Sequence, residues 1–279
     1  MHNFVFFGTP YVARDTLAYL VARNFVPALV VSSPPAPQGR GMALTPSSTA
    51  LYAKELGLPL VTPEKIDKNG IEEIRLYECD YAIVVAYGKI LPEALIAAFP
   101  KGVLNVHYSL LPKYRGASPV EAALLHGERV TGVTIQKMVR ELDAGDVLAA
   151  KEIAIDPGET TRELRPRLIQ AGAELLVEIL PGYLEGTRGA IPQDHSLATK
   201  CGKISKEEGL LDLSGDAHTN WNTYRAYAES PGTYFFYQKG EKKVRVKIKT
   251  AKYENGFFLP IRVVPEGKKE TKYEEVLRG

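Results

Sequence analysis

Residues 4–10, FVFFGTP, form a short apolar run that ends in a turn of glycine, threonine and proline. The residues that follow place Val12, Leu17 and Leu20 near one face of a helix. A strand, a tight turn and a helix in this order are the usual opening of a sheet whose strands are connected by helices. The start of the chain therefore predicts an α/β fold.

The same alternation continues through the first half of the chain. Apolar runs suited to strands and helical patterns alternate, with strands predicted at residues 26–31, 60–61, 81–85 and 103–106 and helices at 48–56 and 92–98. Ser47 or Ser48 can cap the first of these helices. Short buried strands between helices are typical of a mostly parallel, Rossmann-like sheet that is covered on both faces.

The pattern changes after Gly127. Two strand candidates follow at residues 132–138 and 147–155, then a long helix at 160–184 and a polar segment at 186–199. Beyond them, one helix is expected at residues 217–228. Short strand candidates surround it at residues 209–213, 234–238, 244–249 and 258–264. This tail resembles a small β-rich, barrel-like (OB-like) domain. We predict a large domain over residues 1–185, a linker over 186–202 and a small C-terminal domain over 203–279.

The composition is that of an ordinary globular protein of 279 residues, of which 45% are hydrophobic. No stretch approaches the run of about 18 apolar residues that a membrane span needs, and the first residues lack a secretion signal. We therefore expect a soluble, cytoplasmic protein without membrane contact, and a monomer. Cys79 and Cys201 lie far apart without cysteine or histidine partners nearby, so neither a disulfide framework nor a metal site is indicated.

The net charge of +2 conceals a basic tail, because residues 203–279 contain 15 lysines and arginines against 11 aspartates and glutamates. In a strand, alternate residues point to one face, and four cations alternate here with apolar residues: Lys243, Arg245, Lys247 and Lys249. Such a face favours contact with the phosphate backbone of a nucleic acid. The alternative interpretation is a solvated edge strand that lysines protect from aggregation.

Nucleotide cofactors are disfavoured, although the fold class invites them. The first turn has one glycine where a dinucleotide fingerprint needs three, and its Pro10 lacks an amide that could bind phosphate. No GxxxxGK[ST] motif occurs anywhere in the sequence. These absences weaken both an NAD-binding and an ATP-binding hypothesis.

Residues 105–112, NVHYSLLP, directly follow an apolar strand. The strand period of two puts Asn105 and His107 on one face, at the carboxyl edge where open α/β sheets bind ligands. An amide and an imidazole that converge there can polarise a carbonyl group and stabilise the oxyanion that forms on attack by a nucleophile. Downstream, the turn LDAGD supplies Asp143, which could orient His107 or relay a proton, and Asp146, which could share that work.

Residues 102–119 (GVLNVHYSLLPKYRGASP) and 142–146 (LDAGD) together strongly resemble the folate-dependent formyltransferases. Four further segments support the resemblance, FFGTP at 6–10, QGRG at 38–41, VVAYGKILP at 84–92 and ISKEE at 204–208. Within that superfamily, the chain is most similar to the members that formylate methionyl initiator tRNA. The resemblance covers most of the chain.

The resemblance implies that Asn105, His107 and Asp143 are the catalytic residues and that 10-formyltetrahydrofolate is the formyl donor. The folate site would be lined by residues of two loops: Ser109, Leu110, Leu111, Pro112, Ala86, Tyr87 and Gly88. The acceptor would be the α-amine of methionine esterified to initiator tRNA. Arg40, the only cation between Ser32 and Leu44, would contact the tRNA, as would the basic strand of the tail.

Several alternatives stay open at this point. An amino-sugar nucleotide formyltransferase would use the same folate donor and the same three residues on a different amine. A formyl-folate hydrolase would need only water as acceptor, and a non-catalytic RNA-binding module would need only the basic strand. Arg115 either contacts the acceptor or pairs locally.

Overall fold

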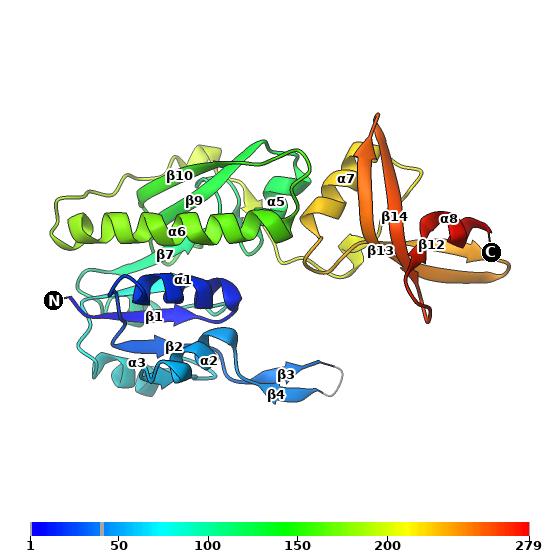
Figure 1. The fold of residues 1–279 in the computed structure, drawn as a ribbon. Coiled ribbons are helices and arrows are strands. Elements are labelled where there is room, and N and C mark those ends of the chain that lie inside the picture. Colours follow the sequence, from blue (N-terminus) through cyan, green and yellow to red (C-terminus); the bar gives the residue numbers. More distant parts are fainter. Residues whose placement is uncertain (1, 40–41, 279) are drawn as a thin grey trace. The chain divides into compact units, whose positions relative to one another are not determined.

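The computed structural model describes residues 2–39 and 42–278 (Figure 1). The chain divides into two compact units. The first comprises Met1–Arg115, Gly132–Ile153 and Pro166–Lys200, and the second comprises Gly116–Thr131, Ala154–Arg165 and Cys201–Gly279. Each unit therefore combines segments that are distant in sequence, and the division into residues 1–185, 186–202 and 203–279 stays a prediction.

The first unit is built on a seven-stranded sheet of order β10-β9-β7-β6-β1-β2-β5. The strands are β1 Phe4–Gly8, β2 Leu29–Val31, β5 Leu60–Val61, β6 Tyr81–Val85, β7 Val103–His107, β9 Val130–Lys137 and β10 Val147–Ala154. Neighbours from β5 to β7 pair in parallel, and β9 is antiparallel to β7. The predicted mostly parallel α/β sheet is thus confirmed.

Helices cover both faces of this sheet: α1 Tyr11–Val21, α2 Ser48–Glu55, α3 Lys68–Arg75, α4 Glu93–Ile96 and α6 Thr161–Leu184. On one face, Phe7 belongs to a core cluster with Ile74 of α3 and Leu95 of α4. On the other face, α6 comes so close at Gly172 that a methyl group there would lie 3.0 Å from Val106. Figure 1 shows α1 and α6 in front of the sheet. In the described part of the chain, no helix is both long and apolar enough to cross a membrane.

The strand order places a switch point at the carboxyl ends of β1 and β6. The chain winds from β1 to β2 in one direction and continues beyond β6 to β7 in the other. In open α/β sheets, ligands bind at the carboxyl edge next to such a switch point. Here the edge carries the loops that begin after Gly8, Val85 and His107.

Two parts of the first unit differ from the sequence-based expectation. The predicted loop at residues 32–44 contains a hairpin of β3 Ala36–Gln38 and β4 Ala43–Thr45, whose strands are too short to produce a periodic pattern. Helix α3 was not predicted, because only Ile74 of its residues is buried and its apolar pattern is correspondingly sparse. Its N-terminus is capped by Asp67, which accepts a hydrogen bond from the Gly70 amide at 3.0 Å.

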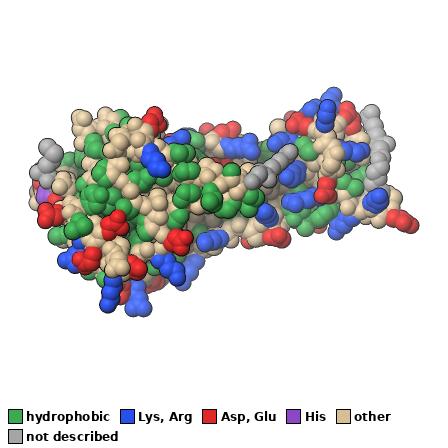
Figure 2. All heavy atoms as spheres, turned by 90° about the horizontal axis from the view of Figure 1, so that it is seen from below, with side chains coloured by type: hydrophobic (Ala, Val, Ile, Leu, Met, Phe, Trp, Pro, Cys, Tyr) green, Lys and Arg blue, Asp and Glu red, His purple; other side chains and the backbone are tan. Residues whose placement is uncertain are grey.

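The β3–β4 hairpin exposes apolar side chains. Met42 is 66% exposed and Leu44 is 72% exposed. Figure 2 shows hydrophobic side chains gathered over this part of the molecule. Arg40, which was predicted to contact nucleic acid, lies outside the described residues.

The second unit contains an antiparallel sheet of order β12-β13-β14-β15. Its strands are β12 Tyr234–Lys239, β13 Lys242–Glu254, β14 Phe257–Pro265 and β15 Thr271–Lys272, and its helices include α5 Pro119–Leu125, α7 Ala217–Ala226 and α8 Tyr273–Arg278. Phe235, Val246 and Val263 form the centre of its core. The predicted β-rich tail is confirmed.

Two details of the tail correct the prediction. The sheet is open rather than barrel-like, since β12 and β15 are its edges among the described residues and the two-residue β15 runs directly into α8. Tyr273 of α8 packs edge-on against Phe235 of the core, with ring centroids 5.7 Å apart. The strand expected at residues 209–213 is reduced to a single bridge between Leu210 and Tyr234, after a 3-10 turn at Glu207–Gly209.

Candidate active site

Asn105 and His107 lie at the carboxyl end of β7, on the sheet face opposite α6. The side chain of His107 is only 5% exposed, and Asn105 is partly buried. The antiparallel register of β9 places Gln136 opposite Asn105 and Thr134 opposite His107. A row of polar side chains therefore interrupts an otherwise apolar sheet, and such buried polar groups need partners.

The carboxylate of Asp143 is the common partner in this row. Its Oδ1 accepts hydrogen bonds from Asn105 Nδ2 at 3.3 Å and from Gln136 Nε2 at 2.8 Å. Its Oδ2 lies 3.6 Å from His107 Nδ1, and both side chains are less than a tenth exposed. The structure thus brings together the three residues that were predicted to be catalytic.

The second ring nitrogen of His107 limits its protonation state. His107 Nε2 lies 2.9 Å from the carbonyl oxygen of Tyr114, which can only accept a hydrogen bond, so Nε2 carries a proton. A neutral ring would then direct the lone pair of Nδ1 toward the negative Asp143 carboxylate. The distance from Nδ1 to the Asp143 carboxylate, 3.6 Å, is longer than a hydrogen bond.

Asp143 sits in a backbone conformation that its neighbours impose. Its φ of 52° lies in the left-handed region, which residues other than glycine seldom occupy. Two residues later, Gly145 packs so tightly that an added Cβ would lie 1.7 Å from the carbonyl oxygen of Lys137. Only glycine fits there, and the turn between β9 and β10 is therefore fixed in shape. Asp146 points outward and is exposed.

The loop after His107 is held by internal hydrogen bonds. Ser109 Oγ donates to the carbonyl oxygen of Lys113 at 2.6 Å, and the Leu111 amide donates to Thr134 Oγ1 at 3.1 Å. The Leu111–Pro112 peptide bond is cis. Leu110, Leu111 and Pro112 are partly exposed, whereas Ser109 is fully buried. The three partly exposed residues can face a ligand, and Ser109 shapes the loop.

The loop after β6 presents backbone rather than a tyrosine side chain. Ala86 and Gly88 have positive φ values of 43° and 81°, and both are exposed. The ring of Tyr87 is 2% exposed and meets Phe7 edge-on, with centroids 5.5 Å apart. Burial raises the pKa of Tyr87 to about 12. Thr9 Oγ1 donates to the Tyr87 carbonyl at 2.9 Å and ties this loop to the first turn.

The basic strand in the second unit has the alternation expected from its sequence. Val246 and Ile248 of β13 are buried, while Lys243, Lys247 and Lys249 are exposed. Between them, the Arg245 guanidinium stacks 3.6 Å above the ring centroid of Tyr234 on β12. Lys243 and Lys247 thus alternate with the buried residues, and Lys249 lies at a bulge in the pairing of β13 with β14.

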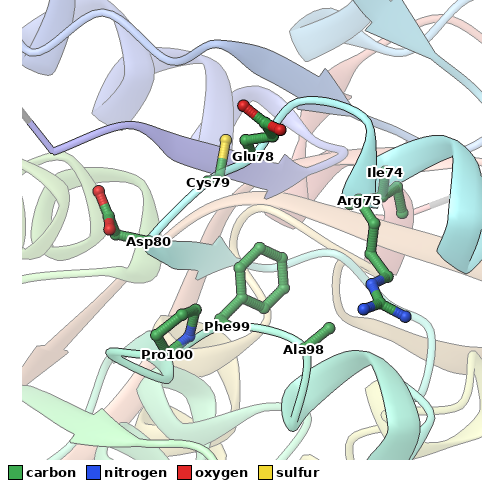
Figure 3. Close-up of a pocket in the computed structure, with 8 residues that line it drawn as sticks. All are labelled: Ile74, Arg75, Glu78, Cys79, Asp80, Ala98, Phe99 and Pro100. Atoms are coloured by element: carbon green, nitrogen blue, oxygen red, sulfur yellow. The ribbon is translucent and has the colours of Figure 1, made fainter.

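A separate depression lies at the amino ends of β6 and β7, where Figure 3 shows the eight residues that line it, including Cys79, Asp80 and Phe99. The loops at the carboxyl edge are not part of it. Desolvation is the main cause that raises the pKa of the Cys79 thiol to about 11, with a smaller contribution from the charge of Asp80. The thiol is therefore protonated near neutral pH and is a poor nucleophile.

Gln136 and Gln193 complete the site, although neither belongs to a motif recognisable in the sequence. Gln136 is found only through the strand register, which pairs it with Asn105. Gln193 lies 50 residues after Asp143, whose carbonyl oxygen accepts a hydrogen bond from it at 2.9 Å. A glutamine at such a distance carries no local signal in the sequence.

Comparison with known proteins agrees with this architecture. Residues 2–180 match the model of the formyl transferase family. Methionyl-tRNA formyltransferase from Thermotoga maritima is 42% identical over 241 residues, which cover 86% of this chain and 77% of the relative. The enzyme of the same name from Carboxydothermus hydrogenoformans is 36% identical over 99% of this chain and 96% of its own length.

Solved structures share the fold at low sequence identity. Methionyl-tRNA formyltransferase from Clostridium thermocellum superposes with a TM-score of 0.62 at 14% identity, over 95% of this chain and 99% of its own. The N-formyltransferase from Helicobacter canadensis, in complex with folinic acid and dTDP-3-aminofucose, gives a TM-score of 0.66 at 17% identity, over 91% and 89%. These two likenesses concern the fold alone.

The α/β fold, the polar row at the end of β7 and the match over residues 2–180 define a formyltransferase. The sequence identity of 36% with the enzyme from Carboxydothermus hydrogenoformans, over 99% of this chain, specifies the family more narrowly. The chain belongs to the methionyl-tRNA formyltransferase family.

Proposed function

We propose that this protein transfers the formyl group of 10-formyltetrahydrofolate to the α-amine of methionyl initiator tRNA. The observation that carries the proposal is the convergence of the Asn105 amide and the His107 imidazole on the Asp143 carboxylate. A carbonyl oxygen bound beside that carboxylate would lie next to the Asn105 amide and the His107 ring. Family membership supports the choice of acceptor.

Asn105 and His107 stabilise the negative charge that develops on the formyl oxygen as the amine attacks the formyl carbon. Donors that are already oriented cost no reorganisation during the reaction, and each is worth about 10²–10³-fold in turnover. The row is oriented in this way, because Gln136 holds the Asp143 carboxylate and the Tyr114 carbonyl holds the His107 ring. Both ring nitrogens of His107 already face partners, so a protonated ring would stabilise the developing oxyanion through its charge.

Asp143 orients His107 and takes part in proton transfer. One bond forms between the amine nitrogen and the formyl carbon, and the bond from that carbon to N10 of the folate breaks. The amine loses one proton and N10 gains one, so a carboxylate can relay the proton directly or through water. A free α-amine titrates near about 7.7–8.0, so roughly a tenth or more of it is neutral at pH 7 and little free energy is needed to deprotonate the rest, which leaves positioning as the larger demand.

The donor would occupy the carboxyl edge of the sheet next to the switch point. Its formyl group is already activated for transfer to an amine, which is the chemistry that it supplies. Ala86 and Gly88 are exposed in the loop after β6, and Leu110, Leu111 and Pro112, partly exposed in the loop after β7, would offer apolar contact. A mixture of exposed backbone amides and apolar side chains suits a flat heterocycle with polar edges.

An acceptor assay tests the proposed function. Purified protein is incubated with 10-formyltetrahydrofolate and either methionyl initiator tRNA or an amino-sugar nucleotide, and the formylated product is identified by mass spectrometry. We expect product from the tRNA alone. Formylation of the sugar nucleotide alone would assign the chain to the other acceptor, and release of formate with both would indicate a hydrolase.

The outer face of β13 is proposed to bind the tRNA backbone. Replacing Lys243, Lys247 and Lys249 together with glutamine should raise the KM for tRNA and leave the KM for folate unchanged. Each lost phosphate contact should reduce the slope of log affinity against log salt concentration by about 0.9, because fewer counterions are released. The slope is measured from tRNA binding at four or five salt concentrations.

A matched triple variant controls for the loss of net charge. Lys54, Lys65 and Lys68 are exposed lysines near α2 and α3 in the first unit. Their replacement by glutamine removes the same total charge and should leave the salt slope as in the wild type. Equal salt slopes for the two variants would mean that β13 is a solvated strand that does not bind the tRNA backbone.

A further inference from the structure

Arg115 is a charged side chain in an unusually closed environment. It is 3% exposed, and burial of a guanidinium is costly unless its donors are used. Two of these donors, Nε and an η nitrogen, reach Gln193 Oε1 at 3.1 and 2.7 Å. The same η nitrogen lies 3.2 Å from Nδ1 of His195, and Glu141 approaches the other η nitrogen only to 3.8 Å. The main partner of Arg115 is thus a neutral amide, and Arg115 pairs locally.

This pairing determines the orientation of the Gln193 amide. An oxygen that accepts two hydrogen bonds from a guanidinium cannot exchange places with the amide nitrogen, because Nε2 would then face the cation. Gln193 Nε2 is therefore directed to the other side, where it donates to the carbonyl oxygens of Asp143 at 2.9 Å and Gly145 at 2.7 Å. Gln193 itself is 7% exposed.

The two carbonyls belong to the turn that presents the Asp143 side chain. Asp143 has the left-handed conformation described above, and Gly145 is in tight contact with Lys137. A sparsely populated backbone conformation persists only where its surroundings hold it. Gln193 holds this turn from outside, whereas Gln136 contacts the carboxylate directly.

We propose that Gln193 and Arg115 are positioning residues for formyl transfer, with Arg115 orienting the Gln193 amide and Gln193 holding the backbone carbonyls of Asp143 and Gly145. The effect of these residues on formyl transfer rests on the proposed function, whereas their hold on the turn does not. Neither side chain touches the reacting atoms, and both act through Asp143. Residue 193 lies in the segment predicted as a linker, so that segment takes part in the catalytic unit.

The kinetic test uses a double-mutant cycle. Gln193→Ala should lower kcat by about tenfold to a hundredfold, as the loss of a residue that orients a catalytic group does, with the KM values for folate and acceptor unchanged. In the Asp143→Asn background the same substitution should lower kcat little further, because the carboxylate through which Gln193 affects the reaction is already absent. Arg115→Lys keeps the buried charge but loses the planar fork, and should give the same pattern with a smaller loss.

Gln170→Ala is the matched control. Gln170 is an exposed glutamine on α6 that donates to Glu174 at 2.9 Å, so its removal should leave kcat as in the wild type. The acceptor in all assays is whichever amine the wild-type protein formylates. A fall in kcat of the same factor in both the wild-type and Asp143→Asn backgrounds would mean a general structural effect and would overturn the positioning role.

A second measurement needs no substrate. Hydrogen–deuterium exchange of the peptide that covers residues 139–147 should be faster in Gln193→Ala than in the wild type, while the peptides of β1 and β6 should be unchanged. Unchanged exchange in the turn would show that Gln193 does not hold it, whatever the enzyme formylates. If the wild-type protein formylated neither amine but exchange in the turn were still faster in Gln193→Ala, the proposed function would be rejected. The structural link between Gln193 and the turn would be retained.

Discussion

Replacement of His107 by alanine is expected to lower kcat for formyl transfer by about 10²–10⁴-fold, the range typical of a lost general acid–base or oxyanion-stabilising group. The imidazole is held between the Tyr114 carbonyl and the Asp143 carboxylate, and nothing else in that row can carry a positive charge. The variant should still fold, because the surrounding strands of the sheet keep their apolar core. Steady-state kinetics and a thermal melt of the same preparation separate the two effects.

His126 is the matched control for this prediction. It also pairs with a backbone carbonyl, since its Nδ1 lies 2.8 Å from the oxygen of Ala122, but it stands at the end of α5 in the second unit. His126→Ala should keep wild-type kcat with a comparable change in melting temperature. If His107→Ala retained full activity, the oxyanion role assigned to the imidazole would be refuted.

Asp143→Asn is expected to reduce kcat by about 10²–10⁴-fold with little change in shape. An asparagine oxygen can still accept from Asn105 and Gln136, but the group that faces His107 Nδ1 becomes neutral. His107 then loses the carboxylate that orients it, and the site loses a proton acceptor. Single-turnover measurement with bound folate donor reports this loss without interference from product release.

The same turn contains the control for this variant. Asp146 lies three positions later and is exposed, so Asp146→Asn removes one negative charge nearby without touching the polar row. It should keep wild-type kcat. Equal losses in the two variants would show that the net charge of the turn, and not the contact of Asp143 with His107, sets the rate.

Most elements of the first unit were predictable where their pattern is local. The apolar run at residues 81–85 coincides with β6, and the expected helix at 160–184 begins one residue later as α6. Ser47 rather than Ser48 caps α2, since its side chain accepts a hydrogen bond from the Ala50 amide at 3.0 Å. Elements without such a pattern were missed, among them α3, the β3–β4 hairpin and α8, because exposed or very short segments have little apolar periodicity.

The contiguous motif at residues 102–119 and the LDAGD turn by themselves led to the proposal of Asn105, His107 and Asp143 as the catalytic residues. Strand periodicity is enough to put Asn105 and His107 on one face, because it depends on the backbone alone. The tertiary structure decided what holds them. Gln136 reaches Asp143 through an antiparallel register, and Gln193 reaches it from a segment that returns to the sheet 50 residues later. Such partners are set by how distant segments pack, which no local pattern in the sequence encodes.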